Sequence, residues 1–154
     1  MRKYSLFLIL NIIFSTFLFS QEKTTSQTAN KEVKIEFLTV ETFKQKIMNY
    51  GDGNYEWKYI GTKPCIIDFY ADWCRPCRML SPILEEMAKK FDGQVIIYKI
   101  NTEQQRELAG LFRISSIPAL LFIPMNNQQP MMLRGYRDAP QLEQEINTYL
   151  LNTK

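Results

Sequence analysis

One apolar run constrains the fold of this chain more than any other feature. The segment PCIIDFYA, at residues 64–71, contains a single charged residue, Asp68. A short run of this composition is typical of a central strand that other elements cover on both faces. An aspartate on a solvent-exposed edge strand is the alternative. A central strand of this kind needs neighbouring strands and a helical layer on each side, which points to an α/β domain.

The segments on either side of this run alternate between helical spacing and short apolar runs. Because parallel strands need long crossovers, and the last two strand patterns are joined by a short polar turn, we predict a mixed sheet of four to five strands with helices on both faces. Pro82 is expected to break or bend its helix, and Asp138 to cap the last one. Further strands are predicted at 33–38, 95–100, 119–123 and 130–136, and helices at 39–50, 77–91, 102–112 and 138–151.

Composition sets limits on size and partners. A chain of 154 residues with 45% hydrophobic residues can bury one sizeable core. Its formal charge of +3 is too small to indicate a nucleic-acid surface. We therefore expect one globular domain, a monomer, that does not bind nucleic acid.

The first twenty residues have the layout of a secretory signal peptide. A basic start is followed by an apolar run at 6–19 and an abrupt change to polar residues at Gln21. A buried helix and an uncleaved membrane anchor are the alternatives, although the run is short for a membrane span. We expect a signal peptide at 1–20, a flexible linker at 21–32 and a folded domain at 33–154. The protein would then be exported, most simply to a bacterial periplasm, with secretion or membrane anchoring as the other possibilities.

Two cysteines stand where the apolar strand ends and a helix begins. Cys74 and Cys77 are three positions apart in the sequence WCRPC. The N-terminus of a helix offers unpaired N–H groups and the positive end of the helix dipole, so it stabilises a thiolate. Cys74, nearer the turn, is expected to be the more exposed and to attack a disulfide first. Cys77, one helical turn on, would then close a small disulfide ring and release the partner.

Other uses of a cysteine pair fit the sequence less well. Zinc usually takes four ligands, whereas this chain has no histidine and only one further cysteine, Cys65. Haem attachment needs a histidine after the second cysteine, where Arg78 stands, and a Cys-His nucleophile is excluded for the same reason. A structural disulfide remains open, although so small a loop removes little entropy from the unfolded chain. We expect no metal or cofactor, and an inert buried thiol at Cys65.

From about residue 33 to its C-terminus the chain resembles the thioredoxin family. The resemblance rests on DFYADWC, the C-x-P-C spacing, the proline in the following helix, SSIPALLF and LRGY, which occur in the family's order. It implies a thioredoxin fold and protein-disulfide reductase activity. Arginine stands at position 75, where typical thioredoxins have glycine.

The resemblance also implies roles for individual residues. Asp68 would lie beneath the cysteines and take a proton from Cys77, and Lys99 would approach Asp68 and tune its pKa; a lysine pointing to water is the alternative. A cis bond at Pro118, in place of an ordinary strand-start proline, would turn the backbone toward the sulfurs. The expected substrate-binding residues are Trp73, which could instead be core, together with Arg75, Pro76, Ile117, Pro118 and Gly135.

We predict that the protein reduces disulfides in exported proteins and is recharged by a membrane electron-relay protein. A disulfide oxidase or isomerase of the same fold is one alternative. A binding or holdase module whose cysteines turn over little is another.

Overall fold

The sheet at the centre of the fold has five strands in the order β1-β3-β2-β4-β5 among the residues that the computed structural model describes, which are 33–51, 56–125 and 128–152. This confirms the predicted mixed sheet. Along the chain the elements are β1 (Glu36–Phe37), α1 (Val40–Lys46), β2 (Cys65–Tyr70), α2 (Arg75–Lys90), β3 (Ile96–Asn101), α3 (Arg106–Leu111), β4 (Ala119–Ile123), β5 (Met131–Arg134), α4 (Ala139–Ile146) and a π-helical end at Asn147–Leu151.

Strand β2 lies at the middle of the sheet. It pairs in parallel with β3 on one side and antiparallel with β4 on the other, so that Asp68 stands opposite Lys99 and Leu120. The first five of its six residues are buried. The interpretation of this run as a central strand is confirmed, and the edge-strand alternative for Asp68 is wrong.

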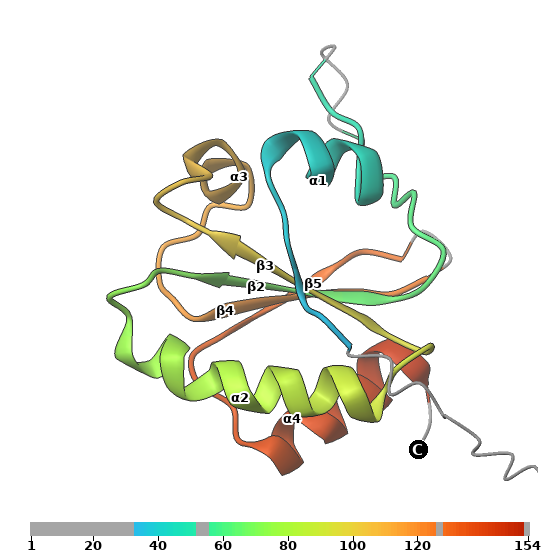
Figure 1. The fold of residues 1–154 in the computed structure, drawn as a ribbon. Helices are drawn as coiled ribbons and strands as arrows, with labels where there is room; N and C mark the ends of the chain where they lie inside the picture. Colours follow the sequence, from blue (N-terminus) through green and yellow to red (C-terminus); the bar gives the residue numbers. More distant parts are fainter. Residues whose placement is uncertain (1–32, 52–55, 126–127, 153–154) are drawn as a thin grey trace, which may run out of the picture. The chain divides into compact units, whose positions relative to one another are not determined.

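Helices cover both faces of the sheet (Figure 1), with α2 and α4 on one face and α1 and α3 on the other. Alternation along β2 divides its side chains between these layers. Ile66 packs in the core beneath α2 and α4, whereas Ile67 and Phe69 pack in the core beneath α1 and α3. Asp68 therefore points to the same face as Ile66, toward α2.

The N-terminal ends of three helices are set by capping residues. Asp138 caps α4 by accepting the N–H of Gln141 at 2.9 Å, as predicted. Thr39 caps α1 in a reciprocal box with Thr42. Helix α2 begins at Arg75, two residues before the predicted start, because Cys74 acts as its N-cap and proline suits the first turn.

Other predicted boundaries also differ from the structure, and neighbouring contacts account for the ends of α1 and α3. Helix α1 ends at Lys46 rather than at residue 50, and the carbonyl of Ile47 accepts the N–H of Ile60. Helix α3 begins at Arg106 rather than at residue 102, because the side chain of Asn101 accepts the N–H groups of the next turn. Strand β1 pairs only with β3 and keeps two residues.

Pro82 does not break α2, which runs as one helix from Arg75 to Lys90. Proline cannot donate the N–H that the carbonyl of Arg78 would accept. Both residues lie on the exposed side of the helix, where water can solvate that carbonyl. On the opposite side, apolar packing of Leu80 and Leu84 holds the helix on the sheet.

The predicted signal peptide and linker, residues 1–32, lie outside the described residues. Within the described ranges no helix is long and apolar enough to cross a membrane.

Candidate active site

The two cysteines form a disulfide at the N-terminus of α2, with 5.3 Å between their Cα atoms. Cys74 is the N-cap residue, and its sulfur accepts the backbone N–H of Cys77 at 3.3 Å. This hydrogen bond comes from one of the N–H groups that a helix leaves unpaired at its start. The same group can stabilise the Cys74 thiolate once the disulfide is reduced.

Both sulfur-bearing residues are buried to the same degree. Cys74 is 3% exposed and Cys77 is 2% exposed. The expected greater exposure of Cys74 is therefore absent from the disulfide form, because Ala71, Tyr70 and Ile117 pack around both cysteines. What distinguishes Cys74 is its place at the cap, where helical N–H groups converge.

Asp68 carries a buried carboxyl group on the face of β2 that α2 covers. Its side chain is fully inaccessible, and neither carboxylate oxygen has a hydrogen-bond partner among the described residues. Burial raises its pKa from 3.8 to about 6, against an opposing effect of Lys99. A carboxyl group with a pKa of about 6 can accept or release a proton near neutral pH.

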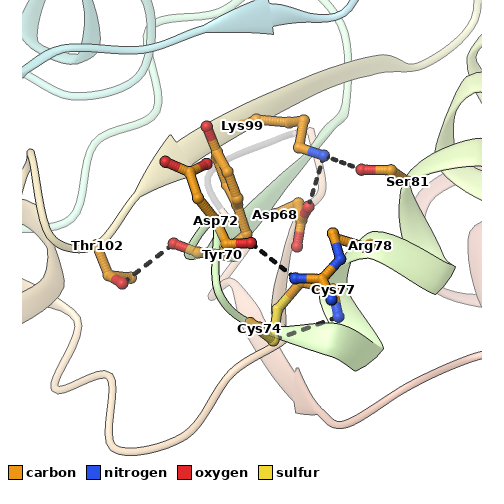
Figure 2. Close-up of a disulfide and its surroundings, with 9 residues drawn as sticks. All are labelled: Asp68, Tyr70, Asp72, Cys74, Cys77, Arg78, Ser81, Lys99 and Thr102. Atoms are coloured by element: carbon orange, nitrogen blue, oxygen red, sulfur yellow. Dashed lines mark hydrogen bonds and ion pairs between the residues drawn. A yellow bond between two sulfur atoms is a disulfide. The ribbon is translucent and has the colours of Figure 1, made fainter.

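Lys99 approaches this carboxyl group from the neighbouring strand (Figure 2). Its Nζ lies 3.4 Å from Oδ2 of Asp68, donates a hydrogen bond to Oγ of Ser81 and sits 4.8 Å from the centre of the Tyr70 ring. Lys99 is 7% exposed. It lies inside the protein beside Asp68, so the alternative of a lysine pointing to water is wrong.

The residues flanking the cysteines form an exposed rim. Trp73 is 67% exposed, which rules out a core position for its side chain. Arg75 and Pro76 are also exposed, in the first turn of α2. These three side chains are accessible to a partner protein.

The segment before β4 lies against the cysteines from the other side. The Ile117–Pro118 peptide bond is cis, and Ile117 packs against the disulfide. The carbonyl of Pro118 accepts the N–H of Gly135 at 2.8 Å, which ties this segment to the end of β5. Gly135 has φ +91°, a conformation that side-chain-bearing residues rarely adopt.

Three residues near the site were not predicted from the sequence. Ser81 and Tyr70 contact the Lys99 ammonium, as described above, and the backbone carbonyl of Asp72 accepts a hydrogen bond from Arg78 at 2.9 Å. A signal for Ser81 was present, since it lies four residues after Cys77 and therefore on the same face of α2. Tyr70 gave no such signal, because only the pairing of β2 with β3 brings its ring to Lys99.

Cys65 lies away from the disulfide, at the opposite end of β2. It is a free, fully buried cysteine whose pKa burial raises to about 12, so it stays protonated at neutral pH. Within the described residues no three Cys, Asp or Glu side chains are grouped closely enough to hold a metal ion.

Comparison with known proteins identifies relatives of this arrangement. The thioredoxin family profile matches residues 34–148. A thioredoxin of Borreliella burgdorferi is 37% identical over 112 residues, which cover 73% of this chain and 94% of the relative. Thioredoxin 1 of a Nostoc species is 30% identical, with the same coverage of 73% and 94%. A crystal structure of chloroplastic thioredoxin z superposes with a TM-score of 0.63 at 26% identity, covering 75% of this chain and 94% of that one.

Proposed function

The chain belongs to the thioredoxin family and is a thiol-disulfide oxidoreductase, and from this premise we propose that it works as a reductase of disulfides in exported proteins. The observation that carries the proposal is the Cys74–Cys77 disulfide at the start of α2, on the helix that packs over Asp68. In the reduced form this pair would hold two electrons as thiols and pass them to a substrate disulfide.

The reaction is proposed to take two steps. The Cys74 thiolate attacks one sulfur of the substrate disulfide, so that a mixed disulfide forms and the first substrate sulfur leaves as a thiolate. Asp68 then takes the proton from the Cys77 thiol, and the Cys77 thiolate attacks the Cys74 sulfur. The Cys74–Cys77 disulfide forms, the second substrate sulfur leaves, and the substrate has been reduced by two electrons.

The rim around the disulfide is proposed to bind the substrate. Trp73, Arg75 and Pro76 are exposed on the α2 side, and Ile117 lies against the sulfurs from the other. A substrate strand could pair with the backbone before β4, in the manner of strand addition to a sheet edge. Gly135 would leave space for that strand beside Pro118.

The charge of Arg75 has a small effect on the reduction potential, and the reduction potential sets the direction of electron flow. Arg75 is exposed. An exposed charge interaction, here between its guanidinium group and a Cys74 thiolate, is worth roughly 0.2 to 1 kcal/mol. Since about 1.4 kcal/mol corresponds to about 30 mV for a two-electron couple, this arginine would raise the potential by about 5 to 20 mV. That is far less than the roughly 150 mV between a reducing thioredoxin and a dedicated oxidase.

Export is proposed from the N-terminal pattern at 1–20. In an oxidising compartment the disulfide would need continual reduction, which a membrane electron-relay protein can provide. Mass spectrometry of the protein isolated from its native cells would show whether the mature chain begins near residue 21. A chain that keeps its first residues in a soluble intracellular fraction would refute the export proposal.

The central experiment measures insulin-disulfide reduction and the potential of the Cys74–Cys77 couple against glutathione. Wild-type protein should reduce insulin and Cys74→Ser should not, with Cys65→Ser as a control that keeps full activity. Equal activity of wild type and Cys74→Ser would favour a binding or holdase module. A potential near that of the strong oxidases would favour the oxidase or isomerase alternative.

A further inference from the structure

We propose that Ser81 is a positioning residue that holds the Lys99 ammonium away from Asp68 and thereby sets the pH range in which Asp68 exchanges its proton. The inference deepens the proposed function and rests on the proton transfer by Asp68. It assigns a role in the resolving step to a hydroxyl group on α2.

The contacts of the Lys99 ammonium carry the inference (Figure 2). Its shorter contact is the hydrogen bond to Oγ of Ser81, whereas it forms a longer ion pair, at 3.4 Å, with Oδ2 of Asp68. A buried ammonium and a buried carboxylate ordinarily approach to about 2.7–2.9 Å. The neutral hydroxyl thus takes the contact that the carboxylate would otherwise accept.

The positions of Asp68, Lys99 and Ser81 in the backbone bring their side chains together. Asp68 and Lys99 are directly opposite each other in the β2–β3 pairing, so the sheet brings them together. Ser81 comes from a different layer, four residues after Cys77 on the sheet-facing side of α2. The ring of Tyr70 closes another side of the ammonium at 4.8 Å. The distance between ammonium and carboxylate is therefore set jointly by the sheet and by α2.

A pocket adjoins Lys99 and Ser81. It has a volume of about 350 Å³ and lies between β1, β3 and α2. The charged and titratable groups near the ammonium come from β2, from α2 and from the segment before β1. They are Asp68, Tyr70, Glu85, Lys89 and Lys34, and Asp72, in the turn between β2 and α2, acts on Tyr70.

Removal of the Ser81 hydroxyl should move the Lys99 ammonium closer to Asp68. The ammonium loses its hydrogen-bond acceptor, and the nearest remaining acceptor is the carboxylate of Asp68 at 3.4 Å. Retreat into the pocket would bring the ammonium toward two like charges, Lys34 and Lys89, and toward one carboxylate, Glu85, whose exposed position lets water screen its attraction. We therefore expect Lys99 in Ser81→Ala to bond Asp68 directly, which favours the ionised carboxylate and lowers the pH at which Asp68 titrates.

The test is a titration of the Asp68 carboxyl carbon by NMR in the oxidised full chain, with carbon-13-labelled aspartate and Asp68→Asn to assign the signal. Ser81→Ala should lower the midpoint by about one pH unit. Ser81→Thr, which keeps a hydroxyl, should stay within about 0.3 unit of wild type. Glu85→Gln, which lines the same pocket, is the matched control. An unchanged or raised midpoint in Ser81→Ala, or an equal fall in Glu85→Gln, would overturn the proposal.

The resolving step separates this inference from the function on which it rests. If Asp68 transfers the proton, the pH profile of mixed-disulfide resolution in Ser81→Ala shifts to lower pH by the same amount as the titration. If Asp68→Asn resolves the mixed disulfide at the wild-type rate, the proton role fails. The NMR midpoint of Ser81→Ala still decides whether the hydroxyl positions Lys99.

Discussion

The ammonium of Lys99 lies 3.4 Å from the carboxylate of Asp68, and both groups are buried between the sheet and α2. Two effects on Asp68 therefore oppose each other. Burial disfavours the charged carboxylate and raises its pKa to about 6, whereas the lysine charge limits that rise. Asp68 is mostly ionised at neutral pH as a result, and it remains basic enough to accept a proton.

Replacing Asp68 by asparagine should slow resolution of the mixed disulfide near pH 7 by on the order of 10²- to 10⁴-fold, which is the typical contribution of a positioned base. In wild type the rate should fall as pH drops below about 6, where Asp68 becomes protonated. Single-turnover measurements on a trapped mixed disulfide, from about pH 5 to pH 8, check both points. A wild-type rate in the variant would contradict the proton role.

The same substitution should stabilise the fold at neutral pH. The folded-state pKa of Asp68 is raised from 3.8 to about 6, so the unfolded chain releases this proton first and stability is lost as pH rises through that window. Above pH 7 the loss in free energy of unfolding reaches its full size of about 3 kcal/mol, since each pKa unit corresponds to about 1.4 kcal/mol. Urea unfolding of oxidised Asp68→Asn should show up to that gain at about pH 7.5 and almost none at about pH 3.5. An equal gain at both pH values would exclude this explanation.

Removing the charge of Lys99 should raise the pKa of Asp68 above its value of about 6, because the lysine is what lowers it. Lys99→Met keeps much of the side-chain volume and serves this purpose. Carbon-13 NMR of the Asp68 carboxyl group measures the change, with the exposed Lys89→Met as a control that should leave it unaltered. A lower midpoint in Lys99→Met would show that the lysine does not favour the carboxylate.

Cys77→Ser should accumulate a mixed disulfide between Cys74 and a substrate protein, because attack can occur while resolution cannot. The covalent adduct can be seen on a non-reducing gel and should disappear with dithiothreitol. A double variant that also carries Cys74→Ser is the control and should form no adduct. Persistence of the adduct in the double variant would assign the attack to Cys65, which is buried and protonated.

Arg75→Gly should lower the reduction potential by only about 5 to 20 mV, since the arginine is exposed and water would screen its attraction to a Cys74 thiolate. Equilibration with glutathione measures the shift, and Arg78→Met provides a second cation on the same helix for comparison. A change approaching the roughly 150 mV that separates a reducing thioredoxin from a dedicated oxidase would mean that Arg75 determines the direction of electron flow.

Much of the fold follows from patterns along the chain. The apolar run around Asp68 predicted a central strand, and the alternation of strand and helix segments predicted the mixed sheet, because burial periodicity reflects which faces are covered. The cap at Asp138 was predictable because it depends on residues three positions apart. The ends of α1 and α3 were not, since distant or competing hydrogen bonds end them.

Patterns along the chain were enough to single out the candidate catalytic groups, a C-x-P-C pair at a strand-to-helix junction and one acidic residue within an apolar run. Their arrangement depends on strand pairing and helix packing. Strand pairing placed Lys99 against Asp68, and helix packing placed Ser81 on the ammonium. Tertiary packing also buried Cys74 as deeply as Cys77. These contacts join residues far apart in the chain, and their distances depend on how the sheet and α2 pack, which no local pattern records.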